Sequence, residues 1–202
     1  MKTRFFWLTV LVLLSGGASF ASPQATQPPR SDAAPTPVVP ATVASPAPSA
    51  QPAAPTVVPY EKLFPFLPAT PEGWSAEKPS GSTTDIEVFK LSTVTQTYQK
   101  GDQENVPVVT VTIIDAGGHK GYFEATTALW KMNAETPDGY DKTVEIDGMP
   151  GYEHYQKGAN SGSLSVVAGG RYFIQVEVTN LGPGELRVWL KKIDVKTLAQ
   201  LK

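Results

Sequence analysis

A Pro- and Ala-rich stretch, Ser22 to Pro59, is the feature that most limits what this chain can fold into. It holds 11 prolines and 9 alanines among 38 residues, and Arg30 and Asp32 are its only charged side chains. Such a composition cannot bury enough apolar surface to offset the entropy lost on folding, and closely spaced prolines favour an extended chain. We therefore predict a disordered linker over residues 22–59, either an inert spacer or a Pro-rich docking strip, followed by one folded domain over residues 60–202.

The residues before the linker have the pattern of an export signal. Lys2 and Arg4 precede an apolar run from Phe5 to Leu14, and small residues lead to a cleavage point after Ala21. The run is about half of the roughly 20 residues that a membrane-spanning helix needs. We predict a signal peptide over residues 1–21, an exported protein that is periplasmic or extracellular, and no stable membrane span after cleavage.

The charge and composition of residues 60–202 exclude several functional classes. This part carries 14 Lys and Arg against 18 Asp and Glu, which is a net charge of −4 with His neutral. Nucleic-acid binding needs a basic surface, and only Lys191-Lys192 forms a basic pair of any note. Because the chain has no Cys, disulfides and thiolate metal sites are excluded and the hydrophobic core must hold the domain. We predict a monomer that binds no nucleic acid.

Apolar periodicity predicts an α+β domain with a mainly antiparallel sheet. Lys120 to Asn133 has the period of an amphipathic helix, and Leu186 to Ile193 forms a second helical stripe. The predicted strands are Trp74–Lys78, Asp85–Gln99, Val106–Asp115, Thr143–Ile146, Tyr152–Gln156, Ser163–Ala168 and Arg171–Thr179. The resulting order, β-β-β-α-β-β-β-β-α, keeps the strands in consecutive runs, which favours antiparallel pairing in a sheet covered by two helices.

Three short motifs resemble those of a known fold family. They are the opening from Leu67 to Trp74 with its Pro-x-Gly-Trp end, the hairpin from Asp147 to Glu153, and the closing Lys192-Ile193-Asp194 with Leu198. They resemble motifs of uncharacterised exported prokaryotic domains, and with strand pairs around a middle helix they are more distantly similar to the PsbP/Mog1-like α/β/α sandwich. The resemblance implies a fold whose members mostly serve as accessory or binding proteins, and it carries over no catalytic residue.

Two histidines are candidate site residues. His119 lies in the Gly-rich bend Asp115 to Gly121 that opens the middle helix, where an anion-binding helix N-terminus and a plain turn are the two interpretations. Strand alternation places His154 on the face of Tyr152 and away from the face of Glu153. Two histidines separated by a helix and a strand are too few ligands for a metal centre, so we predict no metal or cofactor.

Tyr155 and Phe173 are the candidate binding aromatics. Both fall on strands with polar neighbours, so an open sheet face or groove could present them to an envelope protein or a glycan. Aromatic side chains also dominate hydrophobic cores, and core packing is the alternative interpretation.

An export signal without a catalytic motif predicts a non-enzymatic accessory or binding domain of the cell envelope. Ser161, in Gly158-Ala159-Asn160-Ser161-Gly162, does not fit the Gly-x-Ser-x-Gly pattern of a nucleophile. Two alternatives stay open at this point. One is an envelope-directed hydrolase or lyase that uses carboxylates with His119 or His154. The other is a carrier of a small ligand or lipid in a pocket between sheet and helices.

Overall fold

The computed structural model describes residues 56–86, 89–102 and 104–201. The predicted signal peptide, residues 1–21, and nearly all of the predicted linker lie outside these residues. Within the described ranges, no helix combines the length and apolar character that crossing a bilayer requires. All statements below concern this part of the chain.

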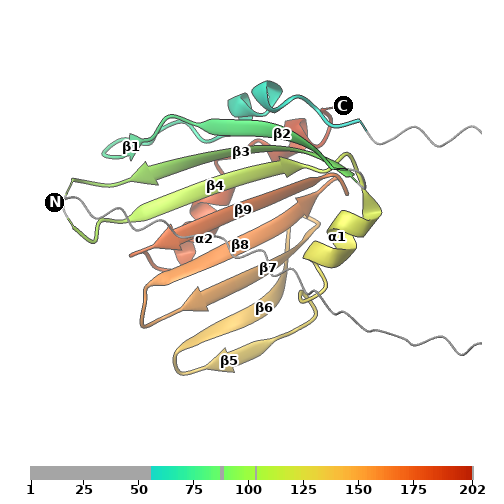
Figure 1. Ribbon diagram of the computed structural model, residues 1–202. Coiled ribbons are helices and arrows are strands. Elements are labelled where there is room, and N and C mark those ends of the chain that lie inside the picture. Colours follow the sequence, from blue (N-terminus) through green and yellow to red (C-terminus); the bar gives the residue numbers. More distant parts are fainter. Residues whose placement is uncertain (1–55, 87–88, 103, 202) are drawn as a thin grey trace, which may run out of the picture. The chain divides into compact units, whose positions relative to one another are not determined.

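The described residues form one antiparallel sheet of nine strands with short helices (Figure 1). Along the sheet the order is β1-β3-β4-β9-β8-β7-β6-β5, and β2 also pairs with β3. The elements are η1 (Tyr60–Lys62), η2 (Phe64–Phe66), β1 (Ser75–Ala76), β2 (Ser80–Ile86), β3 (Phe89–Gln99), β4 (Val108–Asp115), α1 (Lys120–Thr126), β5 (Ala134–Thr136), β6 (Gly139–Ile146), β7 (Met149–Gln156), β8 (Ser161–Ala168), β9 (Tyr172–Thr179), α2 (Gly184–Leu190) and α3 (Val195–Leu198).

The predicted α+β class with a mainly antiparallel sheet is confirmed, but the strand count differs. Four strands precede α1 and five follow it. The segment predicted as one strand, Asp85–Gln99, contains the end of β2 and all of β3, which pair with each other as a hairpin. Strand β2 begins at Ser80, earlier than the predicted start at Asp85, and Ser80 and Gly81 pair with Thr95 and Val94 of β3.

One face of the sheet, called the covered face, carries the hydrophobic core. On β4, β8 and β9, the side chains that point toward this face are buried. They are every second residue of each strand, because successive side chains point to opposite sides. Helix α2 packs on this face through Leu186, Trp189 and Leu190, and Figure 1 shows it behind β4, β9 and β8. The Trp189 ring lies 4.9 Å from that of Trp74 and 4.7 Å from that of Tyr98. These contacts join the helix to the residue before β1 and to β3.

The middle helix lies on the other side of the sheet and is shorter than predicted. Figure 1 shows α1 in front of the strands and α2 behind them. Helix α1 ends at Thr126, whereas the periodicity predicted a helix to Asn133. The hydroxyls of Thr126 and Thr127 donate to the carbonyls of Tyr122 and Phe123, at 2.8 and 2.7 Å. Such back-bonding weakens a helix, and the chain leaves in turns that carry Trp130 onto the sheet.

The packed part begins earlier than the predicted boundary at Tyr60. Val57 and Val58 are 6% and 2% exposed, and the backbone N–H of Val58 donates to a carboxylate oxygen of Asp115 at 2.6 Å. The Arg171 guanidinium binds both oxygens of Asp115, at 2.8 and 2.7 Å, and also donates to the carbonyl of Thr56. At least residues 56–59 therefore belong to the fold, because Asp115 and Arg171 provide hydrogen-bond partners for the backbone of Val58 and Thr56.

Candidate functional site

The face of the sheet opposite α2, called the open face, is polar over most of its area. Cross-strand register aligns its side chains in rows because directly opposed residues point to the same side. Two adjacent rows cross the same six strands, β6, β7, β8, β9, β4 and β3. We call these rows the polar face: Asp141, His154, Ser163, Glu177, Thr110 and Thr97, then Thr143, Tyr152, Ser165, Gln175, Thr112 and Thr95.

Hydroxyl groups order the half of the polar face on β3 and β4. The Thr95 and Thr112 hydroxyls lie 3.1 Å apart, and those of Thr97 and Thr110 lie 3.4 Å apart. All four threonines are partly exposed, so each hydroxyl keeps hydrogen-bonding capacity for a ligand. This part of the face is a prearranged set of neutral donors and acceptors.

Glu177 lies in the middle of the first row, opposite Ser163 and Thr110. Its side chain reaches solvent, yet desolvation by the surrounding strands raises the pKa of its carboxyl above the ordinary value of 4.5. The pKa is raised because neighbouring side chains partly exclude water from the carboxyl, and the two residues opposite it, Ser163 and Thr110, are neutral. A ligand with hydroxyl donors would satisfy this carboxylate without adding charge.

The apolar end of the open face is covered by the turns after α1. Ile114, Phe173 and Val167 follow the second row toward this end. Phe173 is 7% exposed, and its ring lies 6.2 Å from that of Trp130. Trp130 also stacks on Tyr152 with ring centroids 6.5 Å apart. The prediction that Phe173 is presented to a partner is therefore wrong, and Trp130 with Tyr152 are the aromatics at the border of the polar face.

Tyr155 is also buried, although it was predicted as a binding aromatic. It is 4% exposed, its ring stacks on Tyr140 at 6.0 Å, and its hydroxyl donates to the carbonyl of Leu181 at 2.9 Å. Alternation places Tyr155 on the covered face with Tyr140, one position away from His154. Both Tyr155 and Phe173 therefore pack in the interior, as the alternative interpretation of these two aromatics predicted.

His154 and Asp141 form a hydrogen-bonded pair at the β6 end of the first row. The Nδ1 atom of His154 lies 2.7 Å from Oδ1 of Asp141, and both side chains are 38% exposed. The Tyr152 hydroxyl donates to the same oxygen at 3.2 Å. Burial and this bond raise the pKa of Tyr152, so the phenol stays a donor at neutral pH. The pair holds one carboxylate and one imidazole in a defined orientation.

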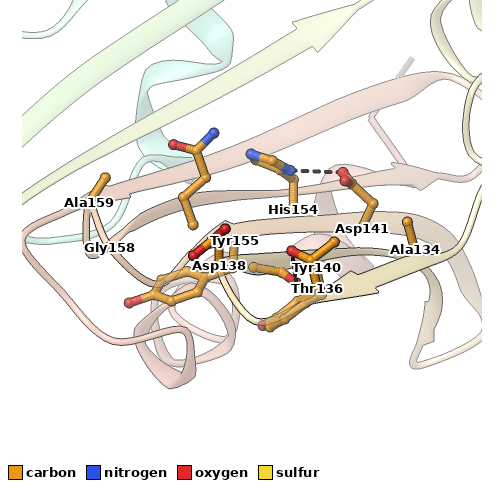
Figure 2. A pocket seen from close by; sticks show the side chains of 11 residues that line it. Ala134, Thr136, Asp138, Tyr140, Asp141, His154, Tyr155, Gly158 and Ala159 are labelled. Atoms are coloured by element: carbon orange, nitrogen blue, oxygen red, sulfur yellow. Dashed lines mark hydrogen bonds and ion pairs between the residues drawn. The ribbon is translucent and has the colours of Figure 1, made fainter.

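A shallow pocket of about 370 Å³ adjoins this pair. Figure 2 shows the His154 ring directed toward Asp141, with the Tyr140 and Tyr155 rings lower in the view. Thr136 and Asp138 at the β5 turn also line the pocket. In β8, Ser163 lies directly opposite His154, so a hydroxyl, an imidazole and a carboxylate follow one another across three strands.

His119 has a local role at the start of α1. Its Nδ1 atom accepts a hydrogen bond from the backbone N–H of Tyr122 at 3.3 Å, which caps the helix. Because the His119 imidazole already accepts a backbone N–H at the start of the helix, the turn interpretation is favoured over an anion-binding site. The structure does not bring His119 close to His154. Helix α1 follows the end of β4, whereas His154 lies near the end of β7, at the opposite ends of the strands. In the described part of the chain, no cluster of three or more His, Asp and Glu residues could hold a metal ion.

No protein-family model, curated protein or solved structure matches this chain.

Proposed function

We propose that this chain is a non-enzymatic binding domain of the cell envelope, and that its polar face holds an extended neutral glycan. The observation that carries the proposal is the alignment of hydroxyl, amide and carboxylate side chains in two rows across six strands. Export to the periplasm or the cell exterior, predicted from residues 1–21, is part of the proposal because envelope glycans occur there.

The chemistry of the polar face favours a sugar polymer over other ligands. Sugars present dense hydroxyl groups, which pair with the hydroxyls of Thr95 and Thr112 and the amide of Gln175. The first row bears Asp141 and Glu177, so a polyphosphate backbone would meet negative charge. At the border, Tyr152 and Trp130 offer aromatic surface to the apolar side of a sugar ring.

The dimensions of the face fit an elongated ligand. Six strands at a spacing of about 4.8 Å make each row about 24 Å long. The two rows lie about 7 Å apart along the strands. A ligand that follows a row can therefore contact several strands at once, and its binding energy is spread over many weak hydrogen bonds.

An accessory role is also what the resemblance to PsbP/Mog1-like sandwiches implies, and this relationship is itself part of the proposal. A sheet with helices α1 and α2 on opposite sides is compatible with such a sandwich. In this interpretation the Pro-rich segment connects the binding domain to its site of action.

Replacing Thr95 and Thr112 together by Val is expected to weaken glycan binding about tenfold. Valine keeps the shape and strand propensity of threonine but removes two hydroxyls, each of which contributes about 0.5–1.5 kcal/mol when hydrogen-bonded. Binding of the full chain to purified envelope polysaccharides and to a panel of soluble neutral glycans, measured by titration calorimetry, tests this expectation.

Thr70→Val is the matched control, because Thr70 is exposed in the segment before β1 and lies outside the polar face. It should bind glycan like the unaltered chain. Unaltered chain that binds none of the glycans, or a Thr95/Thr112 double variant with unchanged affinity, would contradict the proposal.

A hydrolase is the second candidate function, and the alignment of Ser163, His154 and Asp141 favours it. In an ester hydrolase of this kind, the Ser163 hydroxyl would attack the carbonyl carbon while His154 accepts its proton. His154 would then protonate the leaving alcohol, and water would release the acyl group. Asp141 already holds the imidazole through Nδ1.

Under this second candidate, Ser163→Ala and His154→Gln should each lower ester turnover at least 100-fold. Initial rates with p-nitrophenyl esters and acetylated glycans would measure it, with Ser161→Ala in the same strand as the control. Turnover that survives both substitutions, or no turnover by the unaltered chain, leaves the binding role as the sole assignment.

A further inference from the structure

A groove of about 530 Å³ opens on the covered face, at the ends of the strands opposite to the His154 pocket. Its walls come from the β6–β7 hairpin, the turn after β8, and the connection between α2 and α3. The larger apolar side chains that line it are those of Ile146, Met149, Leu190, Ile193 and Val195, and Ala168 and Ala199 add small ones. This volume lies within the range of pockets that bind small molecules in proteins.

The rim of the groove is basic. Lys191, Lys192 and Lys196 all line it and are exposed. In the described part of the chain, none of these three ammonium groups is within ion-pair distance of a carboxylate. Lys192 lies over the ring of Trp189, with its Nζ atom 5.8 Å from the ring centroid. The lysines thus gather on one side of the groove, where Asp194 is the acidic residue whose charge acts on Lys196.

The acidic residue beside the lysines is already used by the fold. Asp194 caps α3, since its carboxylate accepts from the backbone N–H of Thr197 at 3.0 Å and from the Thr197 hydroxyl at 2.7 Å. These hydrogen bonds lower the pKa of Asp194. Asp147 lies in the hairpin turn on the other wall. The side of the groove formed by the α2–α3 connection therefore keeps an excess of positive charge.

We propose that this groove binds the hydrocarbon chain of a single-chain anionic amphiphile, with the anionic head group at Lys191, Lys192 and Lys196. The apolar walls exclude a fully polar ligand, and the basic rim selects an anionic head over a neutral one. A fatty acid carboxylate has this combination. The groove lies on the opposite side of the sheet from the polar face, so this binding is independent of the proposed glycan binding.

Exchange of the three lysines for Gln in one variant should weaken binding of dodecanoate at least tenfold. Dodecyl maltoside has the same chain length and an uncharged head, so its affinity should not change. Both ligands are titrated below their micelle concentrations into the full chain by calorimetry. The three lysines are exposed and Gln is polar and uncharged, so the variant should retain its fold.

Two further variants separate the groove from the charge. Ala199→Trp places a large ring in the groove and should abolish binding of both amphiphiles, with circular dichroism as the check of folding. Exchange of Lys62, Lys78 and Lys100 for Gln removes the same charge from exposed positions that do not line the groove, and it should leave dodecanoate binding unchanged.

Three results would overturn the inference. They are no binding of dodecanoate by the unaltered chain, equal loss of affinity in the two lysine triple variants, and binding to phosphatidylglycerol vesicles without binding of free dodecanoate. The last result would assign the lysines to a membrane surface. The Thr95/Thr112 double variant should bind dodecanoate normally, so failure of the glycan proposal would not affect this result.

Discussion

Replacing Trp189 by Ala is expected to lower the free energy of unfolding by about 3–5 kcal/mol. The side chain is 1% exposed and is among the largest fully buried groups of the core. Its ring packs against the rings of Trp74 and Tyr98, which come from the segment before β1 and from β3. The substitution would leave a cavity between α2 and the sheet, and the lost aromatic contacts add to the cost.

Chemical denaturation of the full chain, followed by far-ultraviolet circular dichroism, measures this loss. Val188→Ala is the matched control on the same helix, because Val188 is 48% exposed and points away from the core. Its effect should stay within about 0.5 kcal/mol. A Trp189→Ala variant as stable as the control would show that α2 does not depend on this side chain for its position.

Asp115→Ala is expected to cost about 3–5 kcal/mol, because it removes one partner of a buried ion pair. The carboxylate is fully buried, and its oxygens accept four hydrogen bonds: two from Arg171, one from the backbone N–H of Gly117 and one from that of Val58. These bonds raise the pKa of Arg171, so the guanidinium stays charged. Without Asp115, a partly buried cation and two backbone donors lose their acceptor.

The loss should also release the segment around Val58. Hydrogen exchange of the Val58 amide should become much faster in Asp115→Ala, since that amide loses its acceptor. Asp85→Ala is the control, because Asp85 forms an exposed ion pair with Lys90 at 3.1 Å. An exposed pair contributes about 0–1 kcal/mol. Equal destabilisation by the two substitutions, or unchanged protection of the Val58 amide, would refute the buried-clamp interpretation.

The sheet itself follows from patterns that are visible in the sequence. In β4, buried residues alternate with half-buried ones, because a strand points successive side chains to opposite sides. In α2, Leu186, Trp189 and Leu190 are buried as the apolar stripe predicted. These are local signals, and they depend on few residues at a time.

The His154–Asp141 pair was within reach of the sequence but was missed. Asp147 and Gly148 both have positive φ, 51° and 78°, and form a two-residue turn between β6 and β7. Such a turn pairs each residue before it with the one equally far after it, which places Asp141 opposite His154. The predicted strands end at Ile146 and resume at Tyr152, which makes the turn five residues long and gives a different register from the observed pairing of Ile146 with Met149.

Other features required the tertiary structure. Nothing local shows that Val57 and Val58 leave a Pro-rich segment and become buried, because Asp115, the hydrogen-bond partner of Val58, is 57 positions away. The burial of Phe173 likewise depends on Trp130, which arrives from the turns after α1. Long-range packing therefore buries Phe173, whose position on its strand left both interpretations open.

By itself, the sequence determined the α+β class, the antiparallel pairing and the core stripe of α2, since these arise from the periodicity of neighbouring residues. Only the tertiary structure decided which side of the sheet stays open, where the lysines meet the apolar groove, and which carboxylate anchors the first packed residues. Each of these depends on side chains distant in sequence, whose meeting is set by strand register and by the packing of whole elements.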